Sequence, residues 1–212
     1  MSATEPGQDC ALCSRLRAFR EVNKAVFPSY FNAPVPSFGL EDASLLIVGL
    51  APGLKGANQT GRPFTGDASG DLLFDCLLKT GFAKGRYQKQ NNDGLTLVDT
   101  MITNAIRCVP PENKPLGEEL KNCRPFLLGQ IGALENLKVI LTLGTVAHTC
   151  TLQAFGLKPA LYKFAHGASH DIGNDILLIN SYHCSRYNVN TGVINADMLT
   201  DVMQQCRLAL DS

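Results

Sequence analysis

Four short apolar runs, separated by segments with helical periodicity, most strongly constrain how this chain can fold. They are LLIVGLAP at 45–52, LTLVDTMITNAI at 95–106, KVILTLG at 138–144 and DILLINSYH at 175–183. Runs of this length are typical of strands buried on both faces, and strands that alternate with helices form a mostly parallel sheet covered on both sides. Ligand sites in such sheets lie beyond the carboxyl ends of the strands. The segments GLAPG, ITNAIRC and SYHCSRYN leave three of these ends.

The segments between the runs predict helices. Their expected ranges are 10–30, 69–80, 115–134 with a bend at Pro125, 145–156, and a C-terminal helix whose apolar stripe is Leu199, Val202, Met203, Cys206 and Leu210. Ser69 and Thr145 are the expected N-caps of their helices. In the first helix, the spacing places four apolar residues on one side: Leu16, Phe19, Val22 and Val26. The stretch 81–94, GFAKGRYQKQNNDG, is polar without an apolar period, so we expect a solvated excursion.

Composition favours one globular domain. The chain has 212 residues, of which 45% are hydrophobic and 18% charged. No apolar run approaches the roughly 18 residues of a transmembrane helix, and MSATEPGQDCALCSRLR lacks the apolar core of a signal peptide, so we expect a cytoplasmic protein without a membrane span. Nineteen basic and nineteen acidic residues give zero net charge, so any nucleic-acid site must be a local patch.

The eight cysteines divide into two groups. In a reducing compartment, cysteines are more often metal ligands, catalytic groups or core residues than disulfides. Cys10 and Cys13 form a CxxC pair, and Cys108 and Cys123 lie beside prolines in RCVPP and NCRPF. The four thiols suit zinc or an iron–sulfur cluster, although the CxxC alone is also compatible with a redox pair. Of the others, we expect three on apolar helix faces and one in a polar loop: Cys76, Cys150 and Cys206, and Cys184.

The glycine-rich segment 49–70, GLAPGLKGANQTGRPFTGDASG, is the longest stretch with chemical content. Its six glycines allow close approach of the backbone to a ligand. It lacks the GK[ST] of a phosphate-binding Walker loop, and its plain alternative is a glycine-rich surface loop. Phe64, among small polar residues, is a candidate platform for stacking a flat ring.

Two polar residues at strand ends are further candidates. Asn104 is the only amide in MITNAI, and an amide can donate and accept along the edge of a nucleobase. His183 ends a strand, where a histidine can donate to an anion that develops in a transition state. The plain alternative is that neighbouring residues satisfy both side chains. The remaining histidines favour structural roles: His148, His166 and His170.

The motifs GLAPG, TGRPFTGDASG, ITNAIRCVPP and SYHCSRYNVNTG, in this order and with four cysteines around them, resemble the iron–sulfur uracil-DNA glycosylases. Leu50 stands where the uracil-restricted family 4 has glutamate, so the chain resembles family 5. The resemblance implies a single domain over 1–212 with a three-layer α/β fold, in which helices flank a four-stranded, mostly parallel sheet. It also implies a [4Fe–4S] cluster with a structural role on Cys10, Cys13, Cys108 and Cys123.

Carried over by position, the resemblance assigns roles to the motif residues. His183, Asn104 and Asp67 would be catalytic: His183 donates to the leaving base, Asn104 holds the edge of the base, and Asp67 positions or activates water. The substrate-binding set would be Gly49, Leu50, Ala51, Pro52, Gly53, Phe64, Asn104, Ser185 and Arg186. Arg186, Tyr187 and Asn188 would belong to the loop that enters the duplex. Cys184 departs from the family, which usually has proline after this histidine.

The implied activity is monofunctional hydrolysis of the N-glycosidic bond of a deaminated base in DNA, in base excision repair. Uracil and, with Leu50 in the first motif, hypoxanthine or other damaged bases are the expected substrates. We expect a monomer that binds damaged DNA and no membrane, with phosphates near Lys55, Arg62, Lys84, Arg86, Lys89, Arg107, Lys114 and Arg186, although these could be ordinary surface charges. The cysteines alone also allow a non-enzymatic iron–sulfur or zinc module that binds DNA or acts in redox chemistry, and the glycine-rich loop allows a nucleotide-binding protein.

Overall fold

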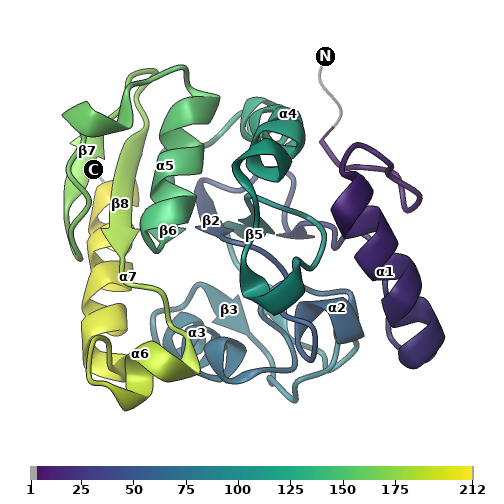
Figure 1. Ribbon diagram of the computed structural model, residues 1–212. Helices are drawn as coiled ribbons and strands as arrows, with labels where there is room; N and C mark the ends of the chain where they lie inside the picture. The colour runs from purple at the N-terminus through teal and green to yellow at the C-terminus, as the bar shows by residue number, and fades with distance from the viewer. Residues whose placement is uncertain (1–3, 212) are drawn as a thin grey trace.

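A mixed sheet of six strands forms the centre of the molecule (Figure 1). The computed structural model describes residues 4–211. Four parallel strands lie in the order β5 (Thr100–Asn104), β2 (Leu45–Gly49), β6 (Val139–Leu143) and β8 (Leu177–Ser181). All but one of their residues are buried, which explains the unbroken apolar runs. The α/β class and the parallel arrangement are confirmed.

The expected strand number was wrong, because two short antiparallel strands extend the sheet. β1 (Phe38–Gly39) pairs with β5, and β7 (Ser169–Asp171) pairs with β8. β1 lies at the end of the proline-containing stretch NAPVPSFG at 32–39, and β7 is polar throughout. Neither run is long enough to show the alternation by which a strand is recognised in sequence. β3 (Ala83–Lys84) and β4 (Thr96–Leu97) pair as a separate hairpin, so the stretch 81–94 contains one short strand and is followed by its partner.

Helices cover both faces of the sheet. On one face, α3 (Ala68–Lys79) and α7 (Ala196–Leu210) share an apolar core with the strands. On the other, α4 (Gly117–Ala133) and α5 (Thr145–Ala154) form a second core. Outside these layers lie α1 (Ser14–Val26), α2 (Ala57–Thr60), α6 (Arg186–Asn190) and the 3-10 turns Pro111–Asn113 and Pro159–Leu161 (Figure 1). Within residues 4–211, no helix has the length and apolarity needed to span a membrane.

Several local expectations were wrong. Asp67, rather than Ser69, caps α3, because its carboxylate accepts hydrogen bonds from two backbone N–H groups of the first turn. Gly144, rather than Thr145, precedes α5. Val22 and Val26 are 55% and 60% exposed, so they do not share the buried side of α1 with Leu16.

Two further expectations were a bend at Pro125 and a position in a polar loop for Cys184. α4 continues through Pro125 as one helix. Cys184 lies in the loop between β8 and α6, as expected, but its side chain is fully buried and the thiol donates to the backbone oxygen of Ser69.

Candidate active site

The carboxyl ends of β2, β5 and β8 open into one cavity of about 290 Å³. This volume is at the lower end of the range for small-ligand pockets. The parallel register places Gly49 of β2 beside Asn104 of β5, which brings the first and third motifs together. The lining residues come from all the motif segments: Leu50, Ala51, Gly53, Ala57, Phe64, Asp67, Ser69, Asn104, Asn113, His183 and Ser185.

Phe64 and His183 form one wall of the cavity. Their ring centroids lie 6.0 Å apart with an interplanar angle of 30°. Gly49 lies under both Phe64 and Asn104: a Cβ there would overlap Asn104 Oδ1 and lie 2.5 Å from Phe64 Cζ. Only glycine therefore leaves room for the ring and the amide at the floor of the cavity.

Asn104 presents an unpaired acceptor. The residue is 2% exposed, and its Oδ1 has no hydrogen-bond partner within residues 4–211. A buried amide oxygen without a donor costs about 1–3 kcal/mol. Since Asn104 lines the cavity, a ligand N–H is the natural partner for this atom.

The backbone of His183 is fixed by a hydrogen bond, and its imidazole ring is neutral. Asn188 Nδ2 donates to the backbone oxygen of His183 at 2.8 Å, and the side chain of Ser185 accepts from Asn188 N at 3.3 Å. Burial lowers the pKa of His183, and the nearby Asp67 carboxylate opposes this shift more weakly. The ring at pH 7 is therefore neutral imidazole, which carries one N–H donor and one acceptor.

The two carboxylate oxygens of Asp67 have different surroundings: Oδ1 caps α3, and Oδ2 faces the glycine-rich loop. Oδ1 accepts from the N–H groups of Ser69 and Gly70, at 3.0 and 3.3 Å. Oδ2 faces the glycine loop, because a Cβ on Gly53 would lie 3.0 Å from it and one on Gly56 would overlap it. The capping bonds fix the carboxylate while its second oxygen remains directed toward the motif loop.

Most of the expected substrate-binding residues line the cavity, and three do not. Gly49 and Pro52 are buried beneath the loop, and Arg186 is exposed at the start of α6. Three lining residues were not expected from the sequence: Ala57, Ser69 and Asn113. Asn113 follows the PP pair of RCVPP, and its backbone φ of +56° favours asparagine and glycine, so the signal was a polar residue in a turn close to a motif.

Two of the eight candidate phosphate-binding residues are unavailable. Arg62 is 4% exposed and forms an ion pair with Asp93, and Arg107 is 1% exposed and lies 3.4 Å from Glu5. The other basic residues are exposed: Lys55, Lys84, Arg86, Lys89, Lys114 and Arg186. Of the eight candidates, these six are accessible to DNA phosphates.

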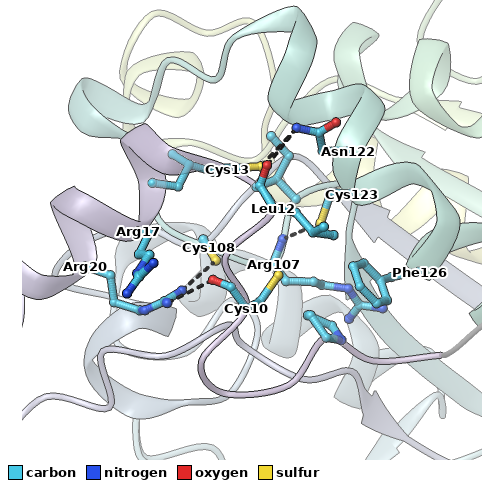
Figure 2. A pocket seen from close by; sticks show the side chains of 13 residues that line it. Cys10, Leu12, Cys13, Arg17, Arg20, Arg107, Cys108, Asn122, Cys123 and Phe126 are labelled. Atoms are coloured by element: carbon cyan, nitrogen blue, oxygen red, sulfur yellow. Dashed lines mark hydrogen bonds between the residues drawn. The ribbon is translucent and has the colours of Figure 1, made fainter.

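Four cysteines line a second cavity, between α1 and the segment that joins β5 to α4 (Figure 2). Cys10 and Cys13 come from the N-terminal segment, Cys108 follows β5, and Cys123 lies on α4. The side chains of Leu16, Ile106 and Phe126 pack with Cys13, Cys108 and Cys123 in one apolar cluster. Within residues 4–211, no three His, Cys, Asp or Glu side chains are arranged to hold a single metal ion.

Three of these sulfur atoms accept hydrogen bonds from nitrogen donors. Arg20 Nη1 lies 3.6 Å from Cys108 Sγ, Asn122 Nδ2 lies 3.8 Å from Cys13 Sγ, and the Arg107 N–H lies 3.4 Å from Cys123 Sγ. Burial raises the pKa of Cys108 to about 11 and that of Cys123 to about 12. These thiols therefore keep their protons at pH 7 unless a metal centre displaces them.

Comparison with known proteins agrees with the motifs. Residues 36–207 match the family model described as the uracil DNA glycosylase superfamily. A type-5 uracil-DNA glycosylase of Thermus thermophilus is 39% identical, over 93% of this chain and 92% of the relative. One from Pyrobaculum aerophilum is 35% identical, over 93% and 87%. A type-4 enzyme from the same organism is 33% identical over 65% and 62%, a less extensive match.

Proposed function

The chain belongs to the uracil DNA glycosylase superfamily, and from this membership we propose that its cavity receives a deaminated base swung out of DNA and hydrolyses the N-glycosidic bond. The protein is an enzyme, a DNA glycosylase that acts on uracil. The observation that carries the proposed mechanism is the meeting of Phe64, Asn104 and His183 around one cavity. Extrusion is required because a stacked base hides its sugar bond, and it costs a few kcal/mol.

Each of the three side chains suits one part of the extruded base. Phe64 offers a flat apolar face for stacking. The unpaired Oδ1 of Asn104 would accept the ring N–H of uracil, and its amide nitrogen could donate to a carbonyl. The neutral ring of His183 would donate its N–H to the base oxygen as negative charge moves onto the leaving base.

Asp67 would act on the other half of the reaction. As the bond breaks, the sugar becomes cationic and the base leaves as an anion. A water molecule then adds to the sugar, and the proton that it loses neutralises the departed base. A carboxylate with one oxygen fixed at the helix cap and the other toward the glycine loop could orient this water and stabilise the positive charge. The products are the free base and an abasic site.

The presence of Leu50 in the cavity favours a substrate range wider than uracil. It lines the cavity with an apolar side chain, so no carboxylate at this position selects among bases by charge or hydrogen bonding. We therefore infer that hypoxanthine, which also has an N–H beside a carbonyl, is a second substrate. DNA would lie across exposed basic residues. The 75% exposed Tyr187, expected in a loop, lies on the short helix α6, which would be the element that enters the duplex.

The cysteine cavity fits a [4Fe–4S] cluster. Cys10, Cys13, Cys108 and Cys123 would hold it, and the N–H donors on three of the sulfurs suit anionic thiolates. The cluster would supply structural cross-links between the N-terminal segment, the end of β5 and α4. Because Cys108 lies four residues after Asn104, these cross-links would hold the strand end that carries the amide.

A duplex panel tests the proposed activity. Duplexes with a single uracil, hypoxanthine or xanthine are incubated with the enzyme and then treated with alkali, which breaks the strand at abasic sites. We expect cleavage at uracil and hypoxanthine and none in an undamaged duplex. Strands that stay intact in every duplex, while the protein still binds DNA, would instead favour the non-enzymatic DNA-binding module.

Loss of one cysteine ligand should remove the cluster. In Cys108→Ser we expect the brown colour and visible absorbance of the purified protein to disappear and its melting temperature to fall. Cys150→Ala is the matched control, because Cys150 is also buried but lies in the core between α5 and the sheet. Absorbance and iron content that persist unchanged in Cys108→Ser would show that this cysteine is not a ligand.

A further inference from the structure

Phe64 adopts a backbone conformation that needs support from its surroundings. Its φ of +54° lies in the left-handed region, which typically costs a residue other than glycine about 1–3 kcal/mol. The following turn at Gly66, with φ +102°, reverses the chain toward α3. Without neighbours that hold this turn, the ring of Phe64 would not keep its place in the cavity wall.

One hydroxyl group bridges the turn that carries Phe64. Tyr87 Oη donates to the backbone oxygen of Phe64 at 3.4 Å and accepts from the N–H of Gly66 at 3.3 Å. Burial raises the pKa of Tyr87 to about 12, so the hydroxyl keeps its proton and remains a donor at neutral pH. The Tyr87 ring packs on Phe74 of α3 with centroids 4.5 Å apart, which fixes the position of the hydroxyl.

A buried ion pair holds the same turn from the other side. Arg62 donates to both carboxylate oxygens of Asp93, at 2.8 and 2.9 Å, and its Nε donates to Thr65 Oγ1 at 2.8 Å. Asp93 also accepts from the N–H groups of Gln88 and Leu95, which fixes the loop that carries Tyr87.

The guanidinium of Arg62 is enclosed by aromatic rings. It lies 5.0, 5.4 and 5.9 Å from the ring centroids of Phe38, Phe74 and Tyr87. At these distances each ring face attracts the cation. The ion pair and Tyr87 therefore form one unit, which contacts the turn at Phe64, Thr65 and Gly66.

We propose that Arg62, Asp93 and Tyr87 are positioning residues for the stacking platform, and that they hold the Phe64 ring in its place before a base enters the cavity. This inference deepens the proposed function and rests on it. None of the three residues lines the cavity, so each would act through Phe64 rather than on the base.

The chemistry of the Arg62–Asp93 ion pair indicates that it orients the Phe64 turn and does not only stabilise the fold. Removing two charges from water is so costly that apolar residues of similar volume often stabilise a protein equally well. A bidentate arginine–carboxylate pair, in contrast, fixes distance and orientation at both ends. Under a ring that must meet a base face to face, orientation is the property that apolar packing does not supply.

A double-mutant cycle between Tyr87 and Phe64 tests the proposal. Tyr87→Phe removes only the bridging hydroxyl, and we expect base release from uracil duplex in single turnovers to slow about five- to tenfold, because the turn loses both hydrogen bonds of this hydroxyl. In a Phe64→Ala background the same change should cost less than twofold, because the platform is already absent. Thr100→Val is the matched control: it removes a buried hydroxyl bonded to Val98 O at the far end of β5, and we expect less than a twofold change.

The double variant Arg62→Met with Asp93→Leu separates geometry from stability. We expect a melting temperature near that of the wild type but at least tenfold slower base release, again without further loss in the Phe64→Ala background. If Tyr87→Phe slowed base release by the same factor with and without Phe64, the proposal would be overturned. The Tyr87–Phe64 cycle gives this answer even if the Arg62→Met, Asp93→Leu protein does not fold. If the wild-type protein released no base, the proposed function itself would be wrong. If the wild type were active but the effects of Tyr87→Phe and Phe64→Ala on the rate were additive in free energy, only the positioning role would be excluded.

Discussion

Replacing His183 with alanine should slow the release of uracil by about 100- to 1,000-fold. One preorganised donor to a developing anion contributes roughly this factor, and the neutral His183 ring is the N–H donor proposed to face the leaving base. Binding to uracil duplex should change little, because the donor acts mainly as charge develops. Single-turnover rates and the dissociation constant, measured in the same buffer, separate the two effects.

Two variants make the His183 prediction specific. His183→Gln keeps an N–H donor of similar reach, so we expect it to recover part of the lost rate. His170→Ala is the matched control, since His170 hydrogen-bonds to Lys163 O and does not line the cavity. A His183→Ala protein that retains more than a tenth of the wild-type rate would exclude His183 as the principal donor to the leaving base.

Gly49→Ala should reduce base release by at least about 100-fold without unfolding the protein. The added methyl group would overlap Asn104 Oδ1 and press on the Phe64 ring, so both groups must move from the positions that hold the base. Displacements of about 1 Å at an active site can cost a factor of 100. Both side chains border the cavity and can shift into it, so the cost falls on activity more than on stability.

The control for Gly49→Ala is Gly132→Ala on α4. A Cβ at Gly132 has no neighbour within 4 Å in the part of the chain that the structure describes, so this change should leave the rate unaltered. Circular dichroism and melting temperature check that both variants are folded. A Gly49→Ala enzyme with a wild-type rate would show that the spacing of Phe64 and Asn104 does not limit catalysis.

The motif residues were predictable because each stands at the end of a strand or in a glycine-rich loop. Asn104 and His183 follow buried runs, and parallel strands bring such ends to one edge of the sheet. Asn113 was not predictable in the same way, because it reaches the cavity from a turn whose path depends on the packing of β5 against α4. The buried Cys184 was also missed, since its polar neighbours hide that its thiol points into the core.

The basic residues show a clear limit of sequence analysis. Arg62 and Lys55 both lie in the glycine-rich segment 49–70, and nothing in the neighbouring sequence distinguishes a buried ion pair from a free cation. The pair forms because the excursion after α3 folds back and brings Asp93, 31 residues downstream, against Arg62. In the same way, Tyr87 belongs to a polar stretch yet packs beneath the loop that carries Phe64.

The sequence by itself determined the α/β class, the parallel strands and the identity of the motif residues, because strand burial, helix periodicity and the alternation of strands with helices are expressed in residues close together along the chain. The tertiary structure decided which charges are buried, which loops support the cavity and how many strands the sheet contains. These features depend on contacts between segments far apart in sequence, where a single desolvated pair or a two-residue strand leaves no periodic pattern to read.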